Sequence, residues 1–524
     1  MTTGPYASVL QQDGPASPAT SQRLADLRRR LAATAPPEIR DLVLGFTSLS
    51  VEHRPTLSAN ARRAWLQRAA ALPRDAAHGR TRTVRVAYGE DADAQALEAR
   101  LGMPFDEVVA CHAAHRPTVA FIGFTPGFPY LLGLPEALHL PRRDRPASRM
   151  PAGAVAIAAG RGGIYPSASP GGWWVLGRTD APLFDPWRDD PAWLGAGDTV
   201  VFEPVGIDAL RSAPVRDPGE GVLAGADGPN LEVVGAVPGS ASLQGRPRWG
   251  GGHLGLAQAG ALDPLALEAA NGMVGNPAHR AALEVLGQPI ALRSEVDLTA
   301  AVTGGGVSVT LDGASIRSWR AFAWPAGAVL ELIPDAAVPG RTAYLAVGGG
   351  YRAQQWRGSD ATDVRAGAGG SGRWVQAGDV LPLDASGTGP PLPHPGRPVY
   401  SARVAVHVHP GPQYAPRAFD ALVSTAFRVH GVDRTGARLD GPPVPWEGEE
   451  IESDGTPWGA VQIPPDGRPI VLLADRGRTG GYPKPAVVDP RDLWRLAQAR
   501  PGDEVWLLDA RRGEVRVERL DSDT

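Results

Sequence analysis

One phrase recurs three times along this chain and constrains its fold more than any other feature. Residues 195–204 (GAGDTVVFEP), 376–385 (QAGDVLPLDA) and 500–510 (RPGDEVWLLDA) each place a Gly-Asp turn before a short apolar run. Gly and Asp supply the turn, and the residues that follow have strand propensity. Gly-Asp turns are common, but these three stand where a polar or Pro-containing stretch follows. The pattern therefore predicts three related β units that end in the same way.

Composition agrees with a β-rich protein of several domains. A chain of 524 residues is too long for one hydrophobic core. Its 65 glycines and 52 prolines follow no period, which favours turns and short strands over long helices. With 43% hydrophobic and 21% charged residues, the chain has the composition of an ordinary globular protein.

Charge, hydropathy and cysteine content exclude several classes of function. A net charge of −4 gives no electrostatic reason to expect nucleic acid or an anionic membrane as partner. No apolar run approaches the roughly 20 residues of a membrane span, and the N-terminus has no apolar signal core. Because Cys111 is the single cysteine, an internal disulfide and a multi-cysteine zinc site are both impossible. We expect a cytoplasmic protein without a metal site.

Changes in residue composition and periodicity divide the chain into segments. Apolar residues at helical spacing follow a serine in SQRLADLRRRLAAT and in SANARRAWLQRAAAL, and LVLGFTSLSVEH between them alternates like a strand. We expect a mainly β protein with an α/β part. The expected segments are a small α/β unit (1–80), a β-barrel (81–205), a Gly- and Pro-rich linker (206–230), two further β-barrels (231–390 and 391–515) and a polar tail (516–524).

Glycine and aromatic residues cluster in the first β unit. FIGFTPGFPYLLGLP at residues 121–135 is too rich in Pro and Gly for a helix and more aromatic than an ordinary loop. Glycines let a backbone approach a ligand closely, although such clusters more often mark the corners of a barrel. Taken alone, the cluster is therefore interpreted as barrel corners rather than as a binding site. Its candidate binding residues are Phe128, Tyr130, Gly162, Gly163, Tyr165, Gly171 and Gly172.

The last β unit has the most polar motifs. Lys484, in TGGYPKP, is the only lysine of the chain, and it follows a buried apolar strand that ends in Asp475 and Arg476. Polar groups at the exit of a buried strand are typical of sites that a rigid scaffold holds. His407 and His409 share one face of a strand, but no third ligand of suitable spacing is near, so a metal site is not expected. The other candidates are Gln413, Arg434, Gln462, Thr479, Gly480, Gly481 and Tyr482.

These motifs carry a resemblance to a known family. Residues 81–204, with GFTPGFPYLLGLP, MPAGAVAIA and GIYPSASPGGWWVLGRT, resemble the B subunit of prokaryotic ATP-dependent 5-oxoprolinase, the KipI or allophanate hydrolase subunit 1 family. Residues 231–508, with HPGPQ, DRTGARLDGP and GAVQIPPDGRPIVLLADRGRTGGYPK, resemble the C subunit, the KipA family of biotin-dependent carboxyltransferase-like proteins. The chain thus resembles a fusion of both subunits.

The resemblance implies cyclophilin-like β-barrels, one in the B-like half and two in the C-like half. It also implies ATP-dependent opening of 5-oxo-L-proline, a lactam, to L-glutamate, with Mg²⁺ accompanying ATP and with a separate A subunit as partner. Two motifs depart from the family: the usual DRMGYRL is DRTGARL, and the usual GGID segment is GGGYRAQQWRGSDATD from Gly348. Both changes are expected to alter the shape of the pocket that the resemblance implies, so the exact substrate stays open, as does a homo-oligomeric state.

The implied chemistry suggests a role for each candidate. Phosphorylation of the lactam oxygen would turn it into a leaving group, so the site must hold phosphate charge and orient the amide. Lys484, Arg476 and Arg434 are expected to hold phosphate or carboxylate. His409, Gln413, Gln462 and Asp475 are expected to orient the amide or transfer protons. The chain has no G-x-x-x-x-G-K-[ST] phosphate loop, so a nucleotide site would be of another kind.

Two other functions stay open at this stage. One is a carboxyltransferase or urea amidolyase type of enzyme that acts on another small amide. Because the only lysine follows Pro483 rather than Met, biotin is not expected on this chain and would arrive on another protein. The other is a KipI/KipA-like regulator of a sensor histidine kinase.

Overall fold

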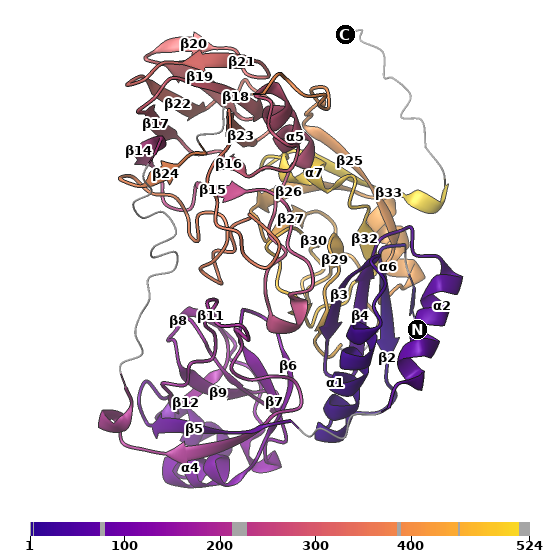
Figure 1. Cartoon of the computed structure of the whole chain (residues 1–524). Coiled ribbons are helices and arrows are strands. Elements are labelled where there is room, and N and C mark those ends of the chain that lie inside the picture. Colours follow the sequence, from indigo (N-terminus) through magenta and orange to yellow (C-terminus); the bar gives the residue numbers. More distant parts are fainter. Residues whose placement is uncertain are drawn as a thin grey trace.

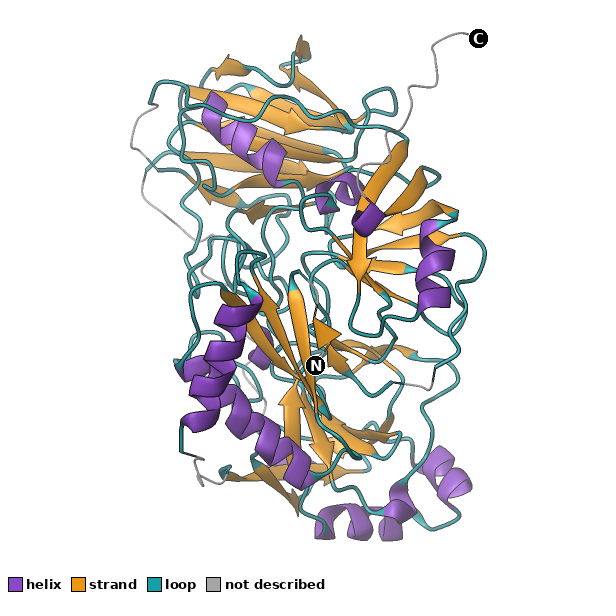
Figure 2. Ribbon diagram, turned by 90° about the vertical axis from the view of Figure 1, so that its right-hand side faces the viewer, coloured by secondary structure: helices purple, strands orange, loops and turns teal. Residues whose placement is uncertain are grey.

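The computed structural model describes residues 2–3, 5–73, 79–211, 228–384, 389–448 and 451–512. Four parts pack together: an N-terminal sheet, a first barrel, a unit of two sheets and a second barrel (Figure 1). Strands form the interior and most helices lie at the outside (Figure 2). Most of the linker expected at 206–230 and the tail expected at 516–524 lie outside the described residues. No helix in the described ranges is long and apolar enough to cross a membrane.

The N-terminal part is a four-stranded sheet with two helices. The strand order is β1 (Thr2–Thr3), β2 (Ala7–Gln11), β4 (Ser48–His53) and β3 (Ile39–Leu44), and the helices are α1 (Pro18–Ala33) and α2 (Ala59–Ala71). The helix expected behind Ser58 is confirmed, because Ser58 accepts a hydrogen bond from Ala61 N–H. The other helix begins one turn earlier than expected. Its cap is Ser17, because Pro18 fits the first helical position.

The first barrel contains seven strands and is closed. Around the barrel the order is β5-β12-β9-β10-β7-β6-β13. The parallel pair of β5 with β13, the strand of the first Gly-Asp phrase, completes the barrel. Its strands are β5 (Thr81–Tyr88), β6 (Thr118–Ile122), β7 (Pro129–Leu132), β9 (Ala154–Ala158), β10 (Arg161–Ile164), β12 (Trp174–Arg178) and β13 (Thr199–Pro204). Outside it lie α3 (Ala94–Leu101), α4 (Phe105–Ala114) and the pair β8 (Ala147–Met150) and β11 (Ser169–Gly171).

The second barrel repeats the first one strand for strand. Its order, β25-β32-β29-β30-β27-β26-β33, is the same when strands are counted along the chain. The third Gly-Asp phrase again supplies the last strand, β33, which runs parallel to the first strand, β25. The strands are β25 (Arg403–Pro410), β26 (Ala426–Val432), β27 (Gly436–Asp440), β29 (Ala460–Gln462), β30 (Ile470–Leu472), β32 (Ala486–Val488) and β33 (Glu504–Asp509).

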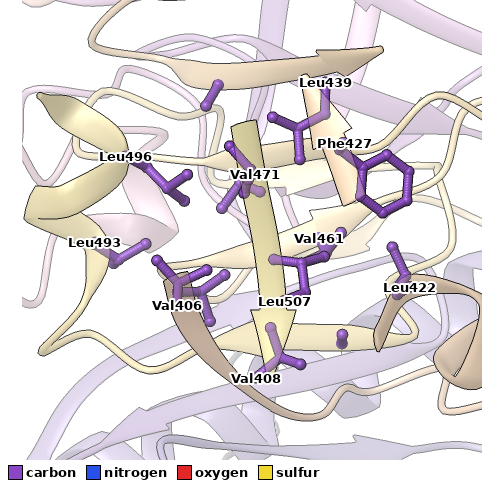
Figure 3. Packing of buried hydrophobic residues seen from close by; sticks show 14 of the residues in the cluster. Val406, Val408, Leu422, Phe427, Leu439, Val461, Val471, Leu493, Leu496 and Leu507 are labelled. Atoms are coloured by element: carbon purple, nitrogen blue, oxygen red, sulfur yellow. The ribbon is translucent and has the colours of Figure 1, made fainter. Parts of the chain in front are cut away.

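The core of the second barrel explains why these strands form. Val406 and Val408 on β25 point inward with Leu507 on β33, since alternate residues of a strand face the interior (Figure 3). The helices α6 (Pro416–Val423) and α7 (Leu493–Ala497) cover the open sides with Leu422 and Leu493. The inward faces are therefore apolar, and polar motif residues must lie on the loops or the outer face.

The middle unit differs from the expectation of a third closed barrel. It consists of one six-stranded and one five-stranded sheet, which enclose a common apolar core. The second Gly-Asp phrase does form the strand beside the first strand of its unit, but this strand, β24 (Val380–Pro382), has only three residues and is antiparallel to β14 (Asn230–Ala236). Pro382 cannot donate a ladder hydrogen bond, which limits pairing beyond it. The sheets therefore stay open.

The remaining elements of the middle unit complete its two sheets. The helix α5 (Pro264–Met273) packs on β18 and β23. The six-stranded sheet also contains β17 (Ile290–Ser294), β19 (Val307–Leu311), β20 (Ala314–Ile316) and β22 (Val329–Pro334). The five-stranded sheet contains β15 (Ala241–Gln244), β16 (Ala282–Leu286), β18 (Leu298–Gly304), β21 (Ala321–Trp324) and β23 (Thr342–Val347).

Candidate functional site

The TGGYPK loop of the second barrel reaches the first barrel. It begins in β31 (Thr479–Gly480), which pairs with β28 (Asp454–Gly455). The Thr479 hydroxyl accepts a hydrogen bond from the backbone N–H of Phe124 at 3.2 Å. Glycine is required at position 123, because a Cβ there would overlap the Thr479 side chain. Two motifs that the sequence separates by more than 300 residues therefore meet at one junction.

On its other side the junction is aromatic. The Phe128 ring contacts the rings of Tyr130, Tyr165 and Trp173 edge-on, with centroids 5.0, 5.1 and 5.7 Å apart. The Tyr130 hydroxyl bonds to Thr479, and burial raises the pKa of Tyr130 to about 12, so the phenol is neutral. Phe124 has a left-handed backbone (φ 64°), a conformation that is strained for a non-glycine residue and that is often found at functional sites.

Two of the four expected glycines give these rings room. A Cβ on Gly163 would lie 2.7 Å from the Phe128 ring, and one on Gly171 would overlap the Tyr165 hydroxyl. Substituents on Gly162 and Gly172 would meet their neighbours at ordinary distances of 3.4 and 3.7 Å. Packing thus accounts for Gly163 and Gly171, as the structural interpretation held, and ligand binding by these glycines stays a prediction.

Lys484 is fully buried and is already paired. Its ammonium forms an ion pair with Asp454 and donates to the Tyr482 carbonyl at 3.1 Å. Gln413 joins the pair: its amide nitrogen donates to Asp454 at 2.8 Å, and its oxygen accepts from Lys484 N–H at 3.2 Å. Burial raises the pKa of Asp454, while Lys484 opposes that rise. Lys484 thus stabilises the loop that contains it.

Gln462 and the exposed tip of the loop complete this arrangement. Gln462 is buried at the end of β29, and a Cβ on Gly480 would lie 2.6 Å from its amide nitrogen. Gly481 and Tyr482 are exposed, and Phe124 and Gly480 are half-buried. A ligand would therefore reach the junction at Phe124 and at the loop tip, with Thr479, Tyr130 and Lys484 buried behind it.

The expected anion-binding arginines also have carboxylate partners. Arg434 donates to both oxygens of Asp475 at 2.7 and 2.9 Å and pairs with Glu284 of the middle unit. Burial alone would lower the pKa of Arg434, but these carboxylates outweigh burial and raise it. Arg476 donates to both oxygens of Glu52 on β4, at 3.0 and 3.1 Å, and to Gln258 at 2.9 Å. Burial lowers the pKa of Arg476 to about 10, against the effect of Glu52. Both guanidinium groups therefore join parts of the molecule.

His409 lies in a separate cluster. Its Nε2 is 3.3 Å from Asp489, which also accepts from the Tyr6 hydroxyl at 3.0 Å and from Arg491. Although burial acts the other way, the hydrogen bonds from His409, Arg491 and Tyr6 hold the pKa of Asp489 well below its ordinary value. A small, mostly apolar pocket borders this cluster, between β2 and the second barrel. No hydrogen bond or ion pair between described residues joins the His409 side chain directly to Lys484 or Asp454.

Four residues of the buried ion pairs were not found from sequence. Asp454 pairs with Lys484 from 30 positions away, and Arg478 pairs with Asp41 at 2.8 Å and Glu52 at 2.9 Å. Charged residues are frequent and usually exposed, so nothing local marks these carboxylates as buried partners. Among the described residues, no group of three or more His, Cys, Asp or Glu side chains could hold a metal ion.

Comparisons with known proteins follow the division into two halves. Residues 2–194 match the family model "Carboxyltransferase domain, subdomain C and D", and residues 254–508 match "Carboxyltransferase domain, subdomain A and B". The chain belongs to the carboxyltransferase domain family as a fusion of both parts. This confirms the resemblance that the motifs carry.

Relatives of this carboxyltransferase fusion include the separate components of 5-oxoprolinase. The B subunit of 5-oxoprolinase from Escherichia coli O157:H7 is 37% identical over 209 residues, which are 38% of this chain and 93% of that protein. The C subunit of 5-oxoprolinase from Escherichia coli K12 is 32% identical over 288 residues, 53% of this chain and 91% of that protein. The crystal structure of TTHA0988 has a TM-score of 0.85 at 38% identity and covers 96% of this chain and 99% of its own.

Proposed function

We propose that this chain is the B and C component of an ATP-dependent 5-oxoprolinase, which opens 5-oxo-L-proline to L-glutamate together with a separate A subunit. One observation carries the proposal: the half similar to a 5-oxoprolinase B subunit and the half similar to a C subunit contact each other through Phe124 and Thr479. A site built from both halves would explain why one polypeptide carries both.

In this proposal the lactam binds at the exposed edge of the junction. Phe124 and Tyr482 flank the ring, and Gly480 and Gly481 let the backbone approach it. Thr479 and neutral Tyr130 hold the loop against the first barrel, and the Lys484–Asp454 pair holds it from behind. These groups contribute chiefly orientation, which is worth several orders of magnitude in rate when a reacting amide is held in place.

ATP does not fit the described side chains of this site. Lys484, Arg434 and Arg476 were expected to neutralise phosphate, but each is already bound to a buried carboxylate. Removing a cation from such a partner would leave a buried charge uncompensated. We therefore assign nucleotide and Mg²⁺ binding to the A subunit or to its contact with this chain, and no step here passes through them.

Carboxyl transfer to another small amide is the second candidate, favoured by the domain family itself. It would require carboxybiotin on another protein, because Lys484 is fully buried and could not be a biotin acceptor. A carboxylated, biotin-bearing carrier protein tests it directly: loss of the carboxyl group from the carrier in the presence of a small amide would replace the first proposal.

The test of the first proposal is glutamate release. The purified chain is mixed with a competent A subunit, ATP and 5-oxoproline, and glutamate and ADP are measured together. We expect both products in equal amounts and only when both proteins are present. Thr479→Val should reduce turnover, whereas the matched control Thr310→Val, in the middle unit, should not. If no glutamate forms with a competent A subunit, the proposal fails.

A further inference from the structure

The contact between the N-terminal sheet and the second barrel is made of charged groups. Asp41 on β3 and Glu52 on β4 lie opposite each other and face the second barrel, beside which these strands lie in Figure 1. Arg478 donates to them at 2.8 and 2.9 Å, and Arg476 donates to Glu52 at 3.0 Å. Each of the four side chains is at most 5% exposed. Ion pairs buried this deeply add little net stability, because the loss of hydration offsets the attraction between the charges.

Some polar atoms of this contact have no bonding partner. Asp41 and Glu52 both bind the same nitrogen of Arg478, Nη2, and within the described ranges its Nε and Nη1 have no hydrogen-bond partner. The same holds for Nε2 of Gln258, whose Oε1 accepts from Arg476 at 2.9 Å. A buried donor without a partner costs free energy of desolvation, which water would return if the contact opened.

Two serines on β4 extend this polar face. Ser48 and Ser50 alternate with residues of the apolar core, so they share the side of the sheet that carries Glu52. Both are 1% exposed, and neither hydroxyl has a hydrogen-bond partner among the described residues. Ser50 packs against the second barrel, since a Cβ on Gly455 would lie 2.4 Å from the Ser50 Cβ. The face of β4 toward the second barrel is therefore polar and incompletely bonded.

The contact between the middle unit and the second barrel is polar too, but its buried carboxylate has three donors. Asp263, which caps α5, accepts from the Tyr400 hydroxyl at 2.9 Å, from the Gln498 amide at 2.8 Å and from Ala266 N–H at 3.1 Å. The Gln498 oxygen accepts in turn from Thr342 N–H at 3.0 Å. Because opening would break these bonds and satisfy no free donor of this set, we expect this contact to stay closed.

A third contact joins the first barrel to the middle unit, and it is largely apolar. Ala192 of the first barrel packs with Leu254 and Trp356 of the middle unit in one buried cluster. The Trp356 indole also donates to the Pro186 carbonyl at 3.0 Å. Exposure of apolar surface to water is unfavourable, so separation here is opposed. The B-like and C-like halves are thus joined by an apolar contact at Trp356 and by a polar contact at Glu52.

We propose that the polar contact at Glu52 is a latch, which opens and closes reversibly while the apolar contact at Trp356 stays closed. Opening hydrates the donors that lack a partner. It also acts on the junction, because Thr479, which accepts from Phe124 N–H, directly follows Arg478. A ligand would then reach side chains that are buried in the closed form. The proposal goes beyond the function proposed above and does not depend on it, because opening is measured without substrate or A subunit.

Thiol labelling of the full chain tests the latch. Ser50→Cys and Ser48→Cys each place a thiol on the polar face of β4, in a Cys111→Ser background that removes the only native thiol. The matched control is Ser8→Cys on the neighbouring strand β2. Ser8 is also 1% exposed, but it lies opposite Val51, on the apolar face of the same sheet. Labelling of a buried thiol follows the population of the open form when opening is fast. We expect both thiols on the polar face to react at least about tenfold faster than the control.

A further substitution tests the ion pairs. Glu52→Gln, added to Ser50→Cys, removes the charge that both arginines share, so labelling should become about tenfold faster or more. Added to Ser8→Cys it should have little effect, which separates opening of the latch from unfolding. Glu232→Gln, which affects a more exposed pair, should leave the rate unchanged. Ser48→Cys keeps the test informative if Ser50→Cys disturbs the packing. The proposal is overturned if the thiols on the polar face react no faster than the control, or if Glu52→Gln does not accelerate their labelling.

Discussion

The two closed barrels share one strand order but differ in what their loops carry. In the first barrel, the loop that reaches the junction, residues 123–128, is aromatic and uncharged, and Phe128 lies at the centre of the ring contacts. In the second barrel, the corresponding region carries buried ions, among them Lys484 and Arg476. The barrels are therefore scaffolds of equal architecture, and the loops decide what each contributes.

The loops of the two barrels stabilise the molecule in different ways. The aromatic loops form a closely packed wall whose stability comes from burial of apolar surface. The charged loops fix the second barrel to its neighbours through pairs such as Arg476–Glu52 and Arg434–Glu284. Changes to the charged loops should accordingly have larger effects than changes to the aromatic wall.

The largest effect is expected from removal of the lysine. Lys484→Met leaves Asp454 buried without a partner, so the free energy of unfolding should fall by about 3–5 kcal/mol. Denaturant unfolding measures this change. The double variant Lys484→Met/Asp454→Leu should recover part of the stability, because it removes both charges; a double variant no better than the single one would show that the pair does not act as a unit.

The second-largest loss of stability is expected when the contact between the N-terminal sheet and the second barrel is broken. Glu52→Gln removes the charge that Arg476 and Arg478 share, which should cost about 2–4 kcal/mol. Its control is Glu232→Gln, which breaks a more exposed pair with Arg293 and should cost under about 1 kcal/mol. Equal losses in the two variants would contradict the account of a buried, structural contact.

The aromatic wall should be sensitive to added volume. Gly163→Ala places a Cβ 2.7 Å from the Phe128 ring, and such overpacking costs about 1–3 kcal/mol. Gly162→Ala is the matched control, since its Cβ would lie at 3.4 Å from Leu131 and should be tolerated. Thermal unfolding of both variants compares neighbouring positions on one strand; equal tolerance would show that the wall is loosely packed.

The smallest effect is expected at the His409 cluster, and it depends on pH. Because hydrogen bonds hold the pKa of Asp489 below that of the unfolded chain, about 3.9, the ionised carboxylate stabilises the fold above that pH. This stability is lost as the pH falls through the lower, folded-state pKa. Asp489→Asn should thus be destabilised at pH 7, and the difference should narrow below about pH 4. The control Asp208→Asn, at an exposed position, should show no such difference.

Local sequence patterns predicted much of the fold. Each Gly-Asp phrase forms a strand that pairs with the first strand of its unit, and two of these pairings complete a barrel. The middle unit could not be predicted in the same way. Whether its sheets close into a barrel depends on the length and direction of β24. These follow from pairing with a strand about 150 residues away rather than from the phrase itself.

The candidate site was predicted only in part, and for a similar reason. Sequence motifs identified Lys484, Thr479 and Tyr130, and the structure brings their loops together. Their partners Asp454 and Glu52 are ordinary acidic residues in the sequence, and only long-range packing makes them buried counter-ions. Sequence reasoning therefore found positions that matter but assigned cations to a ligand where the protein supplies its own carboxylates.

The most direct test of the central claim is 5-oxoproline-dependent glutamate formation by this chain with a competent A subunit, compared between the original sequence and Thr479→Val. Thr479→Val removes one of the contacts between the halves, the hydroxyl that accepts from Phe124 N–H, a loss worth about 1 kcal/mol, while keeping the side-chain volume. The account predicts glutamate formation that needs both proteins and falls several-fold in the variant. Glutamate formation unaffected by Thr479→Val, or absent altogether, would contradict a site shared by the two halves.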